Sequence, residues 1–305
     1  MALRTRVVAG SFAVLLASTG CIALDGADFN KYVEREEKRF STGGTPDVTL
    51  STFDGSIEIR AWDRPEVEVI IEKRAVSKEA AATIEVHADQ NGNRVTVEVK
   101  TEKTRGFGIH FNYSRSAKLI VSAPVSSNIA AKSGDGSIDV AHVSGRLELR
   151  SGDGSIHGRD LGGDVRAHTG DGSIKLEGVS GRLDVDTGDG SVTASGKLTI
   201  VRARSGDGSI TVRADAGSAA QADWDIVTGD GSVTLELPDG FNGELDAHTG
   251  DGGVHVNGIG LTGDTSDNDE DRRRRRKNSV RGRLGSGGKS VRIRTGDGSI
   301  TLRRS

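Results

Sequence analysis

The sequence predicts an all-β protein, a parallel β-solenoid with about 18 residues and two strands per coil and a β-rich N-terminal cap. Three observations predict this fold. The phrase Ser/Thr-Gly-Asp-Gly-Ser followed by Ile or Val recurs along the chain, and apolar residues alternate with polar ones on both sides of each copy. Glycine supplies 43 of the 305 residues, about twice its usual ~7% share, which indicates many tight turns.

The aspartate of each copy marks the period of the repeat. The first five full copies are 18 residues apart and the later gaps are 23, 21 and 46 residues, a spacing typical of a solenoid with loops inserted into some coils. A degenerate earlier copy surrounds Asp54. The eight aspartates of the later copies are Asp135, Asp153, Asp171, Asp189, Asp207, Asp230, Asp251 and Asp297, and the copy at Asp251 has glycine in place of the serine.

The residues around each copy predict the strands and the core. Ile138 and Val140 follow one turn and Leu147 and Leu149 precede the next, and this period of two is typical of a strand with one buried face. If the coils stack at the ~4.8 Å strand spacing, equivalent residues form columns and one continuous core. The column that tests this prediction consists of Ile138, Ile156, Ile174 and Val192.

The turn residues have mechanical explanations. We expect Gly134 and Gly136 to accept positive φ where the chain bends, because a side chain there would collide or strain the backbone. Asp135 is suited to bonding the backbone two residues on, as in an Asx turn. Ser137 and its equivalents are candidates for a ladder of hydroxyl groups between coils.

Composition divides the chain into four parts. We expect a signal peptide at residues 1–20, an anchor linker at 21–45, a cap or irregular first coils at 46–125, and the solenoid at 126–305 with a mobile inserted loop at 263–285. The third part holds strand-like segments at 48–52, 56–61, 67–73, 94–100 and 117–121, and a helix-permissive stretch at 77–82. A cap is expected because an open solenoid end is an unpaired edge.

The N-terminus has the features of an export signal. Arg4 and Arg6 precede an apolar segment at 7–17 and a run of small residues before Cys21, the single cysteine. This arrangement resembles the lipobox of bacterial lipoproteins, which implies lipidation of Cys21 and a bilayer as partner. Ser18 stands where that motif usually has leucine, so an ordinary signal peptide is the alternative. By resemblance to the lipoprotein sorting rules of bacteria with two membranes, Ile22 after the cysteine implies the outer membrane.

A wider resemblance covers nearly everything after the signal. The segment FDGSIEIRAWDRPEVEV at 53–69, the strand VTVEVK, the segment LIVSAP and the GDGS coils together resemble the bacterial "putative adhesin" family of unknown function. The resemblance implies an exported β-solenoid of the cell envelope with no established activity, catalytic residues or cofactor. It does not identify the partner, which we expect to be an envelope protein or a glycan.

The column of aspartates invites a metal hypothesis. Stacked carboxylates repel one another unless solvent, an offset or a cation relieves them, and calcium suits such oxygen ligands. Calcium-binding β-rolls, however, place the acid after the glycines, whereas Asp171 lies between Gly170 and Gly172. We therefore expect solvated turn aspartates and no metal, with a calcium-stabilised roll as an alternative.

Enzymatic action on polysaccharide is a second alternative. Carboxylates that recur identically in every coil argue against a lyase or hydrolase, because catalysis needs one asymmetric group of residues with separated pKa values. His168 and His248 occupy equivalent outward positions, and the sequence has no nucleophile elbow, phosphate-binding loop or zinc-protease motif. We expect no catalytic residues.

Two other features are ambiguous. A basic run follows an acidic one, and it is either a solvated loop or a contact for anionic lipid or glycan. With 41 basic and 44 acidic side chains, a nucleic-acid partner is not expected. Trp224 falls at a core position, whereas the sequence does not decide the role of Trp62. The basic run comprises Arg272, Arg273, Arg274, Arg275, Arg276 and Lys277.

Overall fold

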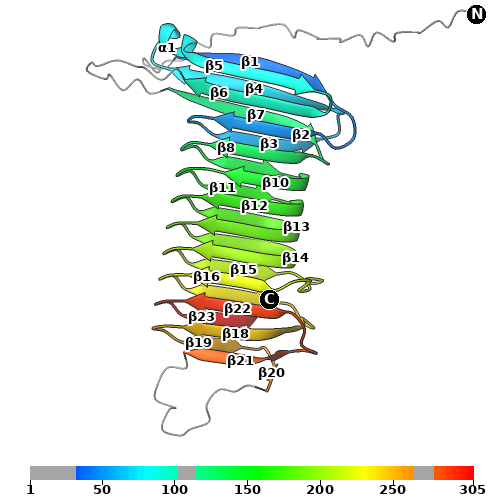
Figure 1. The fold of residues 1–305 in the computed structure, drawn as a ribbon, viewed down its shortest axis with the longest axis vertical. Coiled ribbons are helices and arrows are strands. Elements are labelled where there is room, and N and C mark those ends of the chain that lie inside the picture. Colours follow the sequence, from blue (N-terminus) through cyan, green and yellow to red (C-terminus); the bar gives the residue numbers. More distant parts are fainter. Residues whose placement is uncertain (1–31, 102–114, 264–277) are drawn as a thin grey trace, which may run out of the picture.

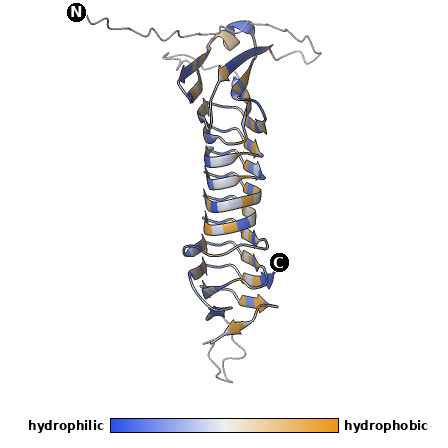
Figure 2. Cartoon of the chain, turned by 90° about the vertical axis from the view of Figure 1, so that its right-hand side faces the viewer, coloured by the Kyte–Doolittle hydropathy of each residue, from blue (hydrophilic) through white to orange (hydrophobic). Residues whose placement is uncertain are grey.

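The computed structural model describes residues 32–101, 115–263 and 278–305. It is a rod of stacked coils whose strands form two faces, with hydrophobic side chains between them (Figures 1 and 2). The helix α1 (Lys78–Ala82) caps one end, beginning after Ser77, whose hydroxyl accepts a hydrogen bond from the Ala80 amide at 3.2 Å. The helix expected at 77–82 is therefore confirmed.

Two stacks of hydrogen-bonded strands make up the rod. In spatial order, face 1 consists of β5 (Ile84–Asn91), β6 (Arg94–Thr101), β2 (Asp47–Thr52), β8 (Asn128–Ser133), β10 (Ser144–Arg150), β12 (Gly162–Thr169), the second halves of β13 (Ile174–Thr187) and β14 (Val192–Ser205), β16 (Trp224–Thr228), β22 (Ser290–Thr295), β18 (Gly243–Thr249), β21 (Ser279–Leu284) and β20 (Leu261–Thr262). In the same order, face 2 consists of β1 (Tyr32–Ser41), β4 (Glu66–Ala75), β7 (Ser116–Pro124), β3 (Ile57–Trp62), β9 (Ile138–Ala141), β11 (Ile156–Arg159), the first halves of β13 and β14, β15 (Ile210–Ala214), β17 (Val233–Leu237), β23 (Ile300–Arg304) and β19 (Val254–Asn257).

The predicted core column is confirmed. Ile138, Ile156, Ile174 and Val192 pair in parallel register one after another, an advance of 18 residues at each step. None of the four is more than 1% exposed. Because every coil contributes equivalent Ile, Leu and Val side chains, the core runs unbroken along the rod, and the all-β solenoid predicted from the repeat is correct.

The turn glycines allow neighbouring coils to approach closely. The expectation of positive φ at Gly134 and Gly136 is wrong, since neither is among the residues with positive φ. A Cβ atom on Gly170 would instead lie 2.7 Å from the carbonyl oxygen of Gly152 in the preceding coil. The Gly170 amide donates to that same oxygen at 2.5 Å, so the glycines are needed because one turn lies directly against the next.

A ladder of buried hydroxyl groups joins the turns, and it uses the residue before each glycine. Thr169 Oγ1 donates to the Gly154 carbonyl at 2.8 Å, and Thr187 Oγ1 donates to the Gly172 carbonyl at 2.8 Å. The predicted ladder uses Ser137 and its equivalents. In the structure, the buried hydroxyl group at each turn is instead that of the Ser or Thr directly before the first glycine. Equivalent donors are Ser133, Ser151, Ser205, Thr228, Thr249 and Thr295.

This ladder predicts an unequal effect of two substitutions in one region of the rod. Thr187→Val keeps the shape of a buried side chain but removes its donor, so we expect the free energy of unfolding to fall by about 1–2 kcal/mol. The control Ser173→Ala alters an exposed hydroxyl and should change stability by less than about 0.5 kcal/mol. Urea unfolding measures both, and equal effects would contradict the ladder.

The coils at both ends stack out of chain order. At the N-terminal end, β2 and β3 lie between β6 and β7 on one side and β8 and β9 on the other. Near the C-terminus, β22 and β23 lie between β16 and β17 on one side and β18 and β19 on the other (Figure 1). Antiparallel strands then cover both ends of the rod, namely β1 and β5 at one and β21 at the other.

Two expected boundaries are wrong. Residues 32–41 form β1 within the range expected as an anchor linker, because alternation along YVEREEKRFS lets this strand pair with β4. Residues 279–284 form β21 within the expected mobile loop at 263–285, because Val280 and Leu284 are buried against the end coil. The cap also contains the unpredicted strand β5, whereas β2 and β3 form a regular coil rather than an irregular one.

A partly buried ion-pair network fastens the inserted C-terminal coil. Asp246 of β18 accepts hydrogen bonds from Arg294 of β22 at 2.6 Å and from Arg281 of β21 at 3.1 Å. Partial burial raises the pKa of Asp246, but the hydrogen bonds and charges of Arg294 and Arg281 outweigh it and hold the pKa below its ordinary value of 3.8. The stabilisation is therefore present above that value and is lost as the pH falls through the lowered pKa.

We expect Asp246→Asn to lower stability at pH 7 by about 1 kcal/mol, a value that allows for solvent screening. The difference from wild type should vanish in acid, because protonation removes the same charge. Asp239, which pairs with Arg304 at an exposed site, supplies the control Asp239→Asn, with an effect below about 0.5 kcal/mol. Thermal melts at several pH values measure both variants, and a difference that does not depend on pH would contradict the network.

Candidate functional site

The outward side chains of the coils form rows of charge along both faces. On face 1, Arg204 pairs with Asp225 of the next coil at 3.0 Å, and His168 lies 3.3 Å from Asp186. Equivalent residues of successive coils are adjacent because the strands are in register. The rows are therefore set by the same stacking that builds the core.

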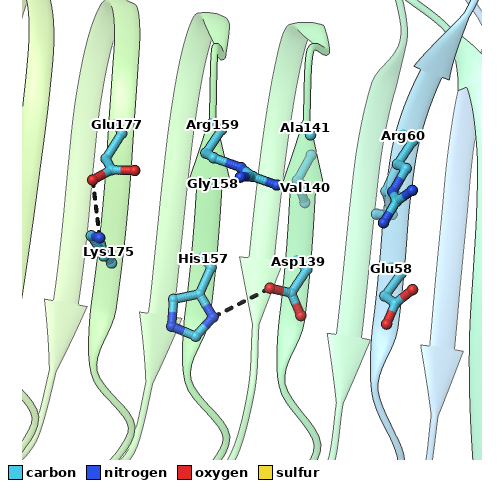
Figure 3. Close-up of a pocket in the computed structure, with 11 residues that line it drawn as sticks. Glu58, Arg60, Asp139, Val140, Ala141, His157, Gly158, Arg159, Lys175 and Glu177 are labelled. Carbon is cyan, nitrogen blue, oxygen red and sulfur yellow. Dashed lines mark ion pairs between the residues drawn. The ribbon is translucent and has the colours of Figure 1, made fainter.

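A groove interrupts the row on face 2, across β3, β9, β11 and β13 (Figure 3). It has a volume of about 360 Å³. Ala141 lies opposite Arg60 on one side and Arg159 on the other, so a methyl group separates two long cationic side chains. The polar residues that line the groove are Glu58, Arg60, Asp139, His157, Arg159, Lys175 and Glu177.

Most charges in this groove have a partner. His157 Nδ1 lies 3.3 Å from Asp139 Oδ1, and Lys175 Nζ lies 3.0 Å from Glu177 Oε1. Glu58 pairs with Lys118 of β7 at 2.6 Å. These pairs place carboxylate, imidazole and ammonium groups at the surface, where they are open to a polar ligand.

A second groove, on face 1, provides a contrast. It has a volume of about 300 Å³ between β10, β12 and β13. Its charges are matched within the surface: Arg150 lies 2.6 Å from Glu148, Arg166 lies 4.0 Å from Asp184, and His168 pairs with Asp186. Acidic and basic side chains are therefore paired in this groove, as they are in much of the rest of the rod.

The structure brings the repeat aspartates into one row along the turns. All eight are exposed, and the half-buried Asp54 continues the row at its N-terminal end. Burial raises the pKa of Asp54, and the charge of Asp135 in the next coil raises it further. Within residues 32–101, 115–263 and 278–305, no group of three or more His, Cys, Asp or Glu side chains is arranged to hold a metal ion.

The two tryptophans have different surroundings. Trp224 is fully buried and packs on Phe241 with 5.1 Å between ring centroids, as the core prediction required. Trp62 donates to the Glu66 carbonyl at 2.8 Å, and the Arg64 guanidinium lies 4.9 Å from its ring centroid, so it closes a turn. Two other predicted sites, Cys21 and the basic run at 272–277, lie outside the described residues.

Residues 47–303 match the family described as Toastrack DUF4097. The chain belongs to this family. This match confirms that the chain belongs to a family, as the resemblance led us to expect, whereas the GDGS repeats as a mark of that family, the signal peptide and the lipoprotein type stay predictions. No helix in the described part of this Toastrack protein is long and apolar enough to cross a membrane.

Solved structures with a distant likeness include three bacterial proteins. A "putative adhesin" from Bacteroides fragilis is 11% identical, with a TM-score of 0.42, and the match covers 88% of this chain and 97% of that one. A "putative cell adhesion protein" from Clostridium sporogenes is 13% identical, with a TM-score of 0.28 and coverage of 90% and 100%. A "putative lipid binding protein" from Parabacteroides distasonis is 10% identical, with a TM-score of 0.29 and coverage of 88% and 96%. No curated protein matches the Toastrack chain.

The row of turn carboxylates makes a prediction about pH. Because folding raises the pKa of Asp54 above 3.8, its charge opposes folding, and stability falls as the pH rises through the interval between the unfolded and folded values. Asp54→Asn should therefore stabilise the protein at pH 7 by about 0.5 kcal/mol, since solvent screens much of the repulsion. The gain should disappear below the unfolded pKa.

Chemical unfolding at pH 7 and in acid measures this effect. Asp171→Asn is the companion variant in the middle of the row, and its effect should be smaller because Asp171 is exposed. If calcium bridged the row, asparagine at either position would instead destabilise the protein in calcium, and the stabilising effect would appear only in chelator.

Proposed function

We propose that this protein is a non-enzymatic, lipid-anchored β-solenoid of the bacterial cell envelope that serves as a surface-binding, adhesin-like or structural scaffold protein. The observation that carries this proposal is the rigid rod whose outward rows present charged groups at fixed intervals. Its core is continuous, and its cross-coil hydrogen bonds extend from β6 to β21. A surface of this kind suits contact with another extended surface component.

The charge arrangement favours binding over catalysis. General acid–base chemistry requires two groups held in different protonation states by different environments. In the face 2 groove the carboxylates of Asp139, Glu58 and Glu177 each lie beside a basic side chain, so no carboxylate there has an environment that sets it apart from the others. Carboxylate oxygens accept hydrogen bonds from ligand hydroxyl groups.

Binding to envelope material tests this function. The purified protein is incubated with isolated envelope polysaccharide, and both bound material and soluble products are measured over time. Saturable binding without product is the expected result. Release of fragments that stops in Asp139→Asn, while Asp186→Asn on the other face stays active, would contradict the proposal and favour a polysaccharide lyase or hydrolase.

The anchor is tested separately by Cys21→Ala. We expect wild-type protein to stay with membranes in high salt and to be released by detergent, since two or more acyl chains give stable anchoring. The variant should appear in the soluble exported fraction, whereas Thr19→Ser, which keeps the cysteine, should behave as wild type. Cell fractionation with immunodetection measures this, and a variant that remains on membranes would refute lipidation. In a bacterium with two membranes, the outer membrane is the expected location.

A further inference from the structure

We propose that Arg60 and Arg159 form a binding site for the carboxylate of an acidic sugar in the face 2 groove. This inference rests on the proposed binding function and names the ligand class of that surface. Both arginines occupy the same outward position of the coil, on either side of Ala141. The backbones that carry them are two strand spacings apart, about 9.6 Å, so one planar anion fits between two guanidinium groups.

The Arg159 side chain is already directed for this role. In register, Arg159 lies opposite Glu177 on β13, yet Glu177 pairs with Lys175 at 3.0 Å. Figure 3 shows Arg159 extending the other way, toward β9. A cation turned away from Glu177 and toward the side on which a second cation lies is less favourable in the free protein, and an anion between the two arginines stabilises that arrangement.

The same position in other coils shows how unusual this pair is. Arg213 lies 3.3 Å from Asp215, and Arg303 pairs with Glu236. Among the residues that the structure describes, Arg60 and Arg159 have no ion pair within 4.0 Å. Two unneutralised guanidinium groups therefore flank a single small outward side chain, and they provide several donors to a carboxylate.

The rest of the groove distinguishes a sugar from a simple anion. Asp139 and Glu58 present carboxylate oxygens beside the arginines, and these accept hydrogen bonds from hydroxyl groups but repel a phosphate dianion. A uronic acid carries both the carboxylate that the arginines require and the hydroxyl groups that the acids require. The groove volume of about 360 Å³ lies in the range of small-molecule sites.

Trigalacturonate is the probe for this site, and isothermal titration at low salt measures its binding to the full-length protein. Arg60→Gln and Arg159→Gln should each weaken binding about tenfold or more, the loss expected for a charge-assisted hydrogen bond. The control Arg213→Gln, at the equivalent outward position of β15, should bind as wild type. Ala141→Glu places a carboxylate between the arginines and should abolish binding, whereas Ser195→Glu, at the residue opposite Arg213 on β14, should not.

Each outcome decides the question. Circular dichroism melts confirm that the variants fold, and Ala141→Glu should melt no lower than Ser195→Glu because its new charge is neutralised. A neutral trisaccharide, inorganic phosphate and phosphatidylglycerol vesicles serve as competitors, and equal or better binding of any of them would overturn the assignment to an acidic sugar. If trigalacturonate does not bind while envelope polysaccharide does, this site is refuted and the proposed function stands. If neither binds, the proposed function fails as well.

Discussion

The close contact between successive turns is the constraint on which the rest of the structure depends. From Gly152 to Gly229, each turn places a glycine amide 2.5–2.6 Å from a glycine carbonyl of the coil before it. No side chain fits between these backbones, and the hydroxyl of the preceding Ser or Thr is buried against them. The turn thereby fixes both the spacing and the register of the coils. Every inward column of Ile, Leu and Val follows from that register.

The same register controls the exterior, which is why the surface chemistry is regular. An outward residue has two neighbours at its own level, one in each adjacent coil. Many charged residues pair either with an opposite charge in an adjacent coil or with one along their own strand. A binding site in such a rod can arise wherever one coil departs from the pattern. Ala141 is such a departure, because a short side chain in one row both opens a groove and leaves an arginine on each side of it.

The repeat allowed the core, the parallel pairing and the two strands per coil to be predicted, because period and alternation depend on local sequence alone. The sequence could not show why glycine is required at the turns, because a positive φ and a close approach of two backbones both favour glycine. Only the distance to the neighbouring backbone distinguishes these two reasons. The outward groove was missed because Arg60 and Ala141 are far apart in the chain. They become neighbours when β3 inserts beside β9, a step that no 18-residue spacing reveals.

Insertion of the first and last coils also changes how the rod is completed. If the coils stacked strictly in chain order, the C-terminal coil would lie at an end with a free edge. Instead, β22 and β23 have partners on both sides, and the outer coil of β18 and β19 is held by contacts to the inserted one, including those between Asp246 and Arg294. The outer coil therefore cannot acquire its parallel partner until the last residues of the chain have docked. At the opposite end, insertion of β2 and β3 couples completion of the cap to formation of the Arg60 and Arg159 site, so a binding-competent groove exists only in a protein whose N-terminal coil has been correctly placed.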